Sequence, residues 1–219
     1  GGDSPAHALK VQRGASFLPA AKLPSHTLIH FANGGGLNVS YVFSREESIY
    51  SQQMTSIRLT LRNTTNQPLA CVRVGAQRLE EKMEMQPFNE LPLGAGQSES
   101  VNIYVDFAGK VQPAAFDLVT DKGTYGVTLK PEAGELVVPL AVDEESFRKL
   151  ERGLRGMHEH KQPLEALPEG GKPELDERVL TLANMRVVGT CVGDKGETEH
   201  LYAAATVCKA TNPVLLVVS

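Results

Sequence analysis

The chain has 219 residues, of which 41% are hydrophobic and 22% are charged, as expected for a globular protein with one large core or two small ones. Its formal net charge of −4 argues against a nucleic-acid-binding domain, which usually carries a basic face. No apolar run approaches the roughly 20 residues that a membrane-spanning helix needs, and the first ten residues, GGDSPAHALK, have no signal-peptide core.

Residues 1–25 are rich in Gly, Ala, Pro and Ser and show no hydrophobic period. Such a composition is typical of a flexible or extended connection between folded parts. We therefore predict a linker or hinge tail over residues 1–25.

From residue 26 the chain carries short runs in which apolar and polar residues alternate, as they do in strands that bury one face. The cleanest run covers residues 57–62, and a second covers residues 101–107. About seven such runs, separated by turn-forming residues at nearly regular spacing, predict an immunoglobulin-like β-sandwich over residues 26–142.

The alternation also predicts which side chains face the interior of the sandwich. Leu59 and Ile103 are central in their runs and are expected inside, whereas Arg58 and Asn102 are expected on the outer face. Cys71 is the only cysteine in this region and the chain has no Trp, so the disulfide and buried Trp of antibody domains are missing. Apolar packing alone must hold the two sheets together.

The pattern changes within residues 134–154, GELVVPLAVDEESFRKLERGL. Its apolar first part, residues 136–142, predicts the last strand of the sandwich. Asp143 follows as a good helix N-cap, because its carboxylate can accept a bond from an otherwise unpaired backbone N–H. Three apolar residues at helical spacing then form one stripe of an amphipathic helix, namely Phe147, Leu150 and Leu154.

This helix is predicted to begin a second subdomain, residues 143–219, with a mixed α+β composition. After a Pro/Gly loop, residues 179–192 indicate strand structure, residues 201–208 return as a second strand, and residues 213–219 start another. One helix and about three strands would leave one face of the sheet still needing cover, so we expect an α+β platform that lacks part of its cover.

The chain has three cysteines, far apart in the sequence: Cys71, Cys191 and Cys208. An odd number of widely spaced cysteines does not indicate a disulfide framework. We predict three free thiols and a reducing compartment. Asn38 and Asn63 match the glycosylation tripeptide, a pattern that often arises by chance.

The sequence offers little that could carry catalysis. Gly34, Gly35 and Gly36 are not followed by the Lys-Ser or Lys-Thr of a phosphate loop, so a turn is the better interpretation. His158 and His160 could join Cys191 and Cys208 around zinc, but structural zinc sites usually supply their cysteines as close pairs. The acidic pairs are better interpreted as solvated turn and helix-start charges than as a general acid and base; they are Glu80–Glu81 and Glu144–Glu145. We assign no catalytic, cofactor-binding or metal-binding residue, no cofactor and no enzymatic activity.

Several longer strings resemble the C-terminal appendage, or ear, of the β subunit of adaptor protein complex 3, in the beta-adaptin family. They are LNVSYVFSR (37–45), MTSIRLTLRNTTNQPL (54–69), MEMQPFNELPLGAGQSESVNIYVDF (83–107) and AAFDLVTDKGTYGVTLKPEAGELVVPLAVDEESFRK (114–149). The resemblance covers residues 26–157 well and the rest of the chain loosely.

The resemblance implies a non-enzymatic appendage of a vesicle-coat adaptor complex. Such appendages recruit accessory proteins, and in some relatives clathrin, while the complex sorts membrane cargo from endosomes and the Golgi to lysosomes and related organelles. The implied partners are the other adaptor subunits and coat proteins, with peripheral, indirect attachment to Golgi, endosomal and coated-vesicle membranes in the cytoplasm. Better-known ears bind peptides in a pocket built around a Trp. This chain has none, so its partner-binding residues stay unknown.

Two other classes of function stay open at this point. An extracellular immunoglobulin-like adhesion or structural module fits the alternation equally well, and disulfides or glycans at Asn38 or Asn63 would favour it. An enzyme would need a metal or an activated nucleophile, and elemental analysis could test for the metal.

Overall fold

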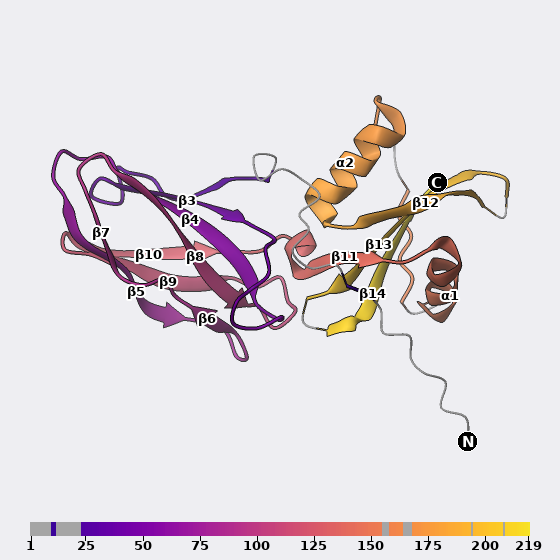
Figure 1. Ribbon diagram of the computed structural model, residues 1–219, viewed down its shortest axis with the longest axis horizontal. Helices are drawn as coiled ribbons and strands as arrows, with labels where there is room; N and C mark the ends of the chain where they lie inside the picture. Colours follow the sequence, from indigo (N-terminus) through magenta and orange to yellow (C-terminus); the bar gives the residue numbers. More distant parts are fainter. Residues whose placement is uncertain (1–9, 12–22, 155–157, 164–167, 194, 208) are drawn as a thin grey trace, which may run out of the picture. The chain divides into compact units, whose positions relative to one another are not determined.

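The computed structural model describes residues 10–11, 23–154, 158–163, 168–193, 195–207 and 209–219. Contacts within the chain divide it into two compact units (Figure 1). One unit is Ser16–Leu136, and the other combines Gly1–Ala15 with Val137–Ser219.

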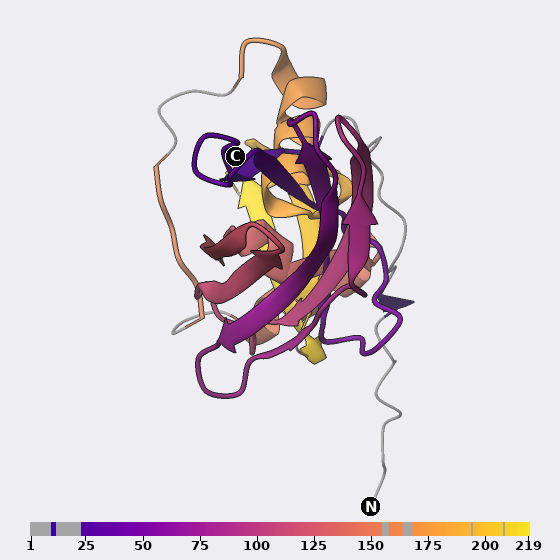
Figure 2. The same ribbon diagram turned by 90° about the vertical axis from the view of Figure 1, so that its left-hand side faces the viewer.

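The first unit is a sandwich of two antiparallel sheets, seen almost end-on in Figure 2. One sheet has the strand order β2-β3-β4-β8-β6 and the other the order β10-β9-β5-β7. The neighbours β3-β4-β8 and β5-β9-β10 correspond to the A-B-E and C-F-G strands of immunoglobulin domains, which confirms the predicted fold class. The strands are β2 (His26–Ile29), β3 (Leu37–Phe43), β4 (Thr55–Asn63), β5 (Leu69–Arg78), β6 (Glu84–Gln86), β7 (Leu91–Leu93), β8 (Ser98–Asp106), β9 (Ala114–Thr120) and β10 (Gly123–Leu129).

The core of the sandwich is built by the inward residues of both sheets, at every second position of each strand. Leu59 and Ile103 are fully buried in it, as predicted. Arg58 and Asn102 are paired directly across β4 and β8 and are only half-buried, so the predicted register is confirmed. No sequence signal indicated β7, because three residues around a central proline are too few to show alternation.

One buried ion pair joins two distant parts of this unit. Arg45 follows β3 with a left-handed backbone (φ 57°), and Glu135 lies in the short 3₁₀ helix η2 (Ala133–Leu136). The Arg45 guanidinium donates from Nε to Glu135 Oε2 at 3.0 Å and from Nη2 to Oε1 at 2.6 Å. Both side chains are more than nine-tenths buried, so the two opposite charges compensate each other away from water.

The second unit has a five-stranded antiparallel sheet among its described residues. β13 lies at its centre: β14 pairs along one edge, while β12 and then β11 pair along successive parts of the other edge. β1 adds to β11. The elements are β1 (Lys10–Val11), β11 (Val137–Ala141), α1 (Glu144–Leu154), α2 (Gly171–Ala183), β12 (Arg186–Val192), β13 (Thr198–Thr206) and β14 (Lys209–Val218).

The two helices cover opposite faces of this sheet (Figure 1). Phe147 of α1 is fully buried in a core with Leu201 and Ala203 of β13, so α1 packs on one face of the platform sheet. Leu175 and Val179 of α2 pack in a second core, which contains the alternate β13 residues Tyr202 and Ala204. Because α2 covers the other face, the prediction of a sheet left bare on one side is wrong.

The helix α2 also corrects the prediction of strand structure over residues 179–192. The chain is helical to Ala183, ends the helix at Asn184 in a left-handed conformation, and becomes a strand only from Arg186. Leu175 and Val179 are one helical turn apart, which places both against the sheet. A short apolar run fits a buried helix end as well as a strand, and this ambiguity explains the error.

The strand predicted as the last of the sandwich, residues 136–142, is β11 (Val137–Ala141) of the second unit, and only Leu136 belongs to the sandwich. Its residues Val137, Val138 and Pro139 pair with Thr206, Ala205 and Ala204 of β13. The boundary at 142/143 therefore lies too late for this strand, since the sandwich unit ends at Leu136. Within the predicted tail, residues 1–25, Lys10 and Val11 form a strand, and residues 1–9 and 12–22 lie outside the described residues. The hinge role of this tail stays a prediction.

We predict that Leu59→Ala and Ile103→Ala each lower the free energy of unfolding of the sandwich by about 2–5 kcal/mol, because each leaves a cavity in a packed core. Asn102→Ala, on the outer face of the same strand pair, should change it by less than about 0.5 kcal/mol. Urea denaturation of the three variants checks this. Equal losses for inner and outer positions would contradict the register.

We predict that Phe147→Ala lowers the stability of the second unit by about 3–5 kcal/mol, since the ring is fully buried between α1 and β13. Hydrogen exchange should become faster in residues from Val137 onward and stay unchanged in the sandwich. Uniformly faster exchange throughout the chain would show that the two units unfold as one.

Candidate interaction surfaces

The start of α1 has the predicted cap. Asp143 Oδ1 accepts a hydrogen bond from the backbone N–H of Ser146 at 2.8 Å, and the Asp143 carbonyl accepts from Phe147 N at 2.9 Å. The pKa of Asp143 lies below its ordinary value, because the side chain and then the backbone of Ser146 donate to the carboxylate. The cap fixes where α1 begins, and so which of its side chains meet the sheet.

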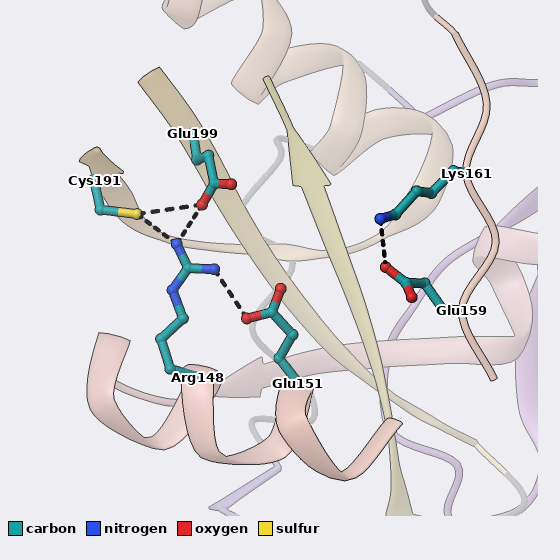
Figure 3. A network of polar contacts seen from close by, with 6 residues as sticks. All are labelled: Arg148, Glu151, Glu159, Lys161, Cys191 and Glu199. Carbon is teal, nitrogen blue, oxygen red and sulfur yellow. Dashed lines mark hydrogen bonds and ion pairs between the residues drawn. The ribbon is translucent and has the colours of Figure 1, made fainter. Parts of the chain in front are cut away.

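A polar cluster formed by Arg148, Glu151, Cys191 and Glu199 lies at the contact of α1 with the sheet (Figure 3). Arg148 Nη1 donates to Glu151 Oε2 at 2.9 Å, while Nη2 donates to Glu199 Oε2 and to Cys191 Sγ, the latter at 2.9 Å. The pKa of the Arg148 guanidinium is raised, chiefly because Glu199 and then Glu151 accept its hydrogen bonds. One side chain thus connects α1 with both β12 and β13.

The polar contacts of this cluster hold α1 against the sheet. The guanidinium faces two carboxylates and a thiol, so its charge is compensated within the protein. Arg148 and Glu199 are 25% and 16% exposed, so the pair is largely shielded from water. We interpret the cluster as the contact that fixes the orientation of α1 on the sheet.

Within the described part of the chain, the residues considered for metal or acid–base chemistry form no common site. His158 and His160 are exposed, and the acidic pairs Glu80–Glu81 and Glu144–Glu145 are exposed as well. Among the described residues no group of three or more His, Cys, Asp and Glu could hold a metal ion. Cys71 and Cys191 are free thiols, and Cys208 lies outside the described residues, so its state stays a prediction.

None of the described helices is long and apolar enough to cross a membrane.

Among the described residues of the second unit, three large apolar side chains are exposed to solvent: Leu182 of α2 and Val187 and Val192 of β12. Val187 pairs with Tyr202, which belongs to the α2-side core, so Val187 lies on the α2 side of the sheet. Val192 is 74% exposed and lies farther along the same strand. Contiguous exposed apolar patches mark contacts with other proteins, whereas single exposed apolar side chains are common. We consider these side chains as candidate contacts.

The sandwich has a second group of exposed apolar side chains, in the loops at one end of its strands. Ile49 is 78% exposed and Tyr50 is more than half exposed in the loop between β3 and β4. The Tyr50 ring meets the Tyr104 ring edge-on, with the two ring centroids 5.2 Å apart. Val111 lies in the loop after β8, which ends beside the start of β4. An Ile-Tyr pair within a loop of Ser, Glu and Gln is the sequence signal that could have indicated this surface.

Two family models match the chain, one over most of the sandwich unit and the other over the second unit. The model for the C-terminal part of the clathrin-adaptor complex-3 beta-1 subunit matches residues 6–112, and that described as "AP-3 complex subunit beta-1, C-terminal domain" matches residues 134–219. The chain belongs to the AP-3 beta C-terminal family.

Relatives of this AP-3 beta region agree over most of the chain. The AP-3 complex subunit beta-1 of Mus musculus is 33% identical over 185 residues, which is 84% of this chain and 16% of the mouse protein. The Homo sapiens protein of the same name is 32% identical over 194 residues, or 88% of this chain and 17% of its own length. The AP-3 complex subunit beta of Dictyostelium discoideum is 26% identical over 133 residues, 58% of this chain and 12% of its own length. The chain thus spans about a sixth of the length of the mouse and human proteins.

Two solved structures also match part of this AP-3 beta region. They are the GAE domains of yeast GGA1 and of GGA2p from Saccharomyces cerevisiae, with sequence identities of 13% and 12%. They cover 48% and 49% of this chain and 96% of their own, with TM-scores of 0.30 and 0.29. Because these TM-scores are low, we assign the sandwich fold from the strand pairing described above and not from these two structures.

We predict that Arg148→Ala lowers the stability of the second unit by about 1–2 kcal/mol, because it leaves the carboxylate of Glu199 without its partner in a partly buried site. Arg148→Lys should recover only part of the loss, since an ammonium cannot reproduce the planar fork. Thermal or urea denaturation measures both.

The matched control is Arg152→Ala, an exposed arginine on the same helix, for which we expect a change below about 0.5 kcal/mol. Equal losses of stability for Arg148→Ala and Arg152→Ala would show that the cluster does not hold α1 on the sheet.

Proposed function

We propose that the chain is a non-enzymatic appendage of an AP-3-type vesicle-coat adaptor and recruits accessory proteins during cargo sorting from endosomes and the Golgi to lysosomes and related organelles. The observation that carries this proposal is family membership over both units, the sandwich and the platform. The remainder of the full-length chain would join the other subunits of the complex. Membrane attachment would be peripheral and indirect, on the cytoplasmic side of Golgi, endosomal and coated-vesicle membranes.

The exposed apolar side chains support a recruiting role, because each unit has its own set. Ile49 and Tyr50 lie on a loop of the sandwich, whereas Val187 and Val192 lie on the edge strand β12 of the platform. Tyrosine is among the residue types that carry most of the binding energy in protein interfaces, and the aliphatic side chains add apolar area that a partner can bury. Since the chain has no Trp, we propose side chains such as these for the recognition of accessory or coat proteins, clathrin included.

The test is a replacement in mouse cells that lack AP-3 complex subunit beta-1. The cells receive the intact mouse protein, the protein without the region matched here, or the protein with this chain in place of that region. We expect the intact protein and the replacement to keep lysosomal membrane proteins off the cell surface, and the deletion to raise their surface level several-fold. Antibody uptake measures the surface level, and co-precipitation of the other subunits controls for assembly.

Normal sorting by the deletion protein, with the complex assembled, would overturn the proposal. A second arm uses the chain as bait in cytosol, with Ile49→Asp and Val192→Asp as surface variants. Thr190→Asp, at an exposed polar position of β12, is the matched control. Loss of a coat or accessory protein with one variant only would identify the unit that binds it.

A further inference from the structure

Tyr50 is the one exposed tyrosine of the chain, whose five tyrosines all lie in the described part. It is 56% exposed, whereas Tyr41 and Tyr104 are 9% exposed and Tyr202 is fully buried. Tyr125 is half-buried. An enzyme that modifies the phenolic oxygen of a tyrosine in the folded protein therefore reaches Tyr50 more readily than the other four.

The loop that carries Tyr50 is not part of either sheet of the sandwich. The backbone pairing of β3 with β4 reaches only as far as the N–H of Ser44, which donates to the carbonyl of Ser56 at 3.0 Å. Within the described loop, residues 46–50 form no backbone–backbone hydrogen bond. This segment can therefore enter the cleft of an enzyme without breaking any strand pairing.

The side chain of Tyr50 has few contacts with the rest of the sandwich. Its ring meets that of Tyr104 edge-on, and its hydroxyl forms no hydrogen bond with the described residues. The hydroxyl of Ser48, by contrast, accepts hydrogen bonds from the backbone N–H groups of Tyr50 and Ser51, at 3.1 and 3.4 Å. Ser48 thus stabilises the bend of the loop, whereas the phenolic oxygen of Tyr50 has no such structural role.

Two carboxylates precede Tyr50 in the segment EESIY. Glu46 and Glu47 are both exposed, and Glu46 forms an ion pair with Arg58 at 2.6 Å. Acidic side chains three and four positions before an acceptor fit a basic substrate groove, because complementary charges guide the encounter and fix its register. Ile49, which is 78% exposed, adds an apolar side chain directly beside the acceptor. These features indicate an enzyme that binds acidic, partly apolar segments.

We propose that Tyr50 is the phosphorylation site of this chain for a tyrosine kinase that accepts acidic segments. The phenolic oxygen of Tyr50 attacks the γ-phosphorus of ATP, the bond from that phosphorus to the oxygen it shares with the β-phosphate breaks, and ADP leaves with the electron pair of that bond. A carboxylate base of the kinase accepts the phenolic proton. The phosphate adds a charge of about −1.5 to −2 next to Glu47 and Ile49, so the loop becomes strongly anionic. The site stands independently of the recruiting role proposed above, because it depends on the exposure and the sequence of the loop alone.

The test incubates the full chain with Mg²⁺, ATP and a purified tyrosine kinase domain that is active on the acidic copolymer poly(Glu,Tyr). Peptide mass spectrometry then locates the phosphate, and we expect several-fold more of it on Tyr50 than on the other four tyrosines together. Tyr50→Phe, which keeps the ring and its contact with Tyr104, should remove most of the incorporation. Phosphate shared evenly among the five tyrosines, or none on Tyr50 while the copolymer is phosphorylated, would overturn the proposal.

The variant Glu46→Gln/Glu47→Gln tests the role of the acidic residues, and we expect it to lower kcat/KM for phosphorylation of Tyr50 several-fold. The matched control is Glu80→Gln/Glu81→Gln, at another exposed acidic pair of the sandwich, which should leave kcat/KM unchanged. Equal values of kcat/KM for the two variants would contradict recognition through the carboxylates that precede Tyr50.

Discussion

The second unit depends on one constraint, which is that its central strand β13 is buried on both faces. Residues Leu201–Ala205 are all fully buried, and alternate residues belong to two different cores. Leu201 and Ala203 pack under α1, whereas Tyr202 and Ala204 pack under α2. A strand buried on both sides requires cover on both sides, and this requirement explains why a helix lies on each face. Alanines at the centre let both helices approach the sheet closely.

The same constraint explains which strands could be predicted from the sequence. A strand with one buried face alternates, and the sandwich strands were predicted well because they follow this rule, with Leu59 inward and Arg58 outward. The run LYAAATVC, residues 201–208, does not alternate, which is typical of a strand covered on both faces. Interpreted in this way, the run requires a second helix, and residues 171–183 could then have been considered for it.

Local signals and long-range ones differ in how far they can be predicted. The start of α1 was predicted from Asp143, because a helix cap involves residues two or three positions apart. The unit to which β11 belongs could not be predicted in this way, because its partner strand β13 comes much later in the chain. The same holds for the cluster of Arg148, Cys191 and Glu199, whose members have ordinary sequence surroundings and meet only through the fold. The exposure of Ile49 could have been predicted in part, since the residue lies in a loop of polar residues.

The ion pair of Arg45 and Glu135 determines where the sandwich can be separated from the rest of the protein. A fragment ending before Glu135 would leave the guanidinium of Arg45 buried without its carboxylate, which is a costly arrangement. A fragment extended through Ala141 would carry the apolar strand β11 without β13, an exposed edge that favours aggregation. A recombinant fragment of the sandwich alone should therefore end at Leu136, which follows Glu135 of the ion pair and precedes the first residue of β11.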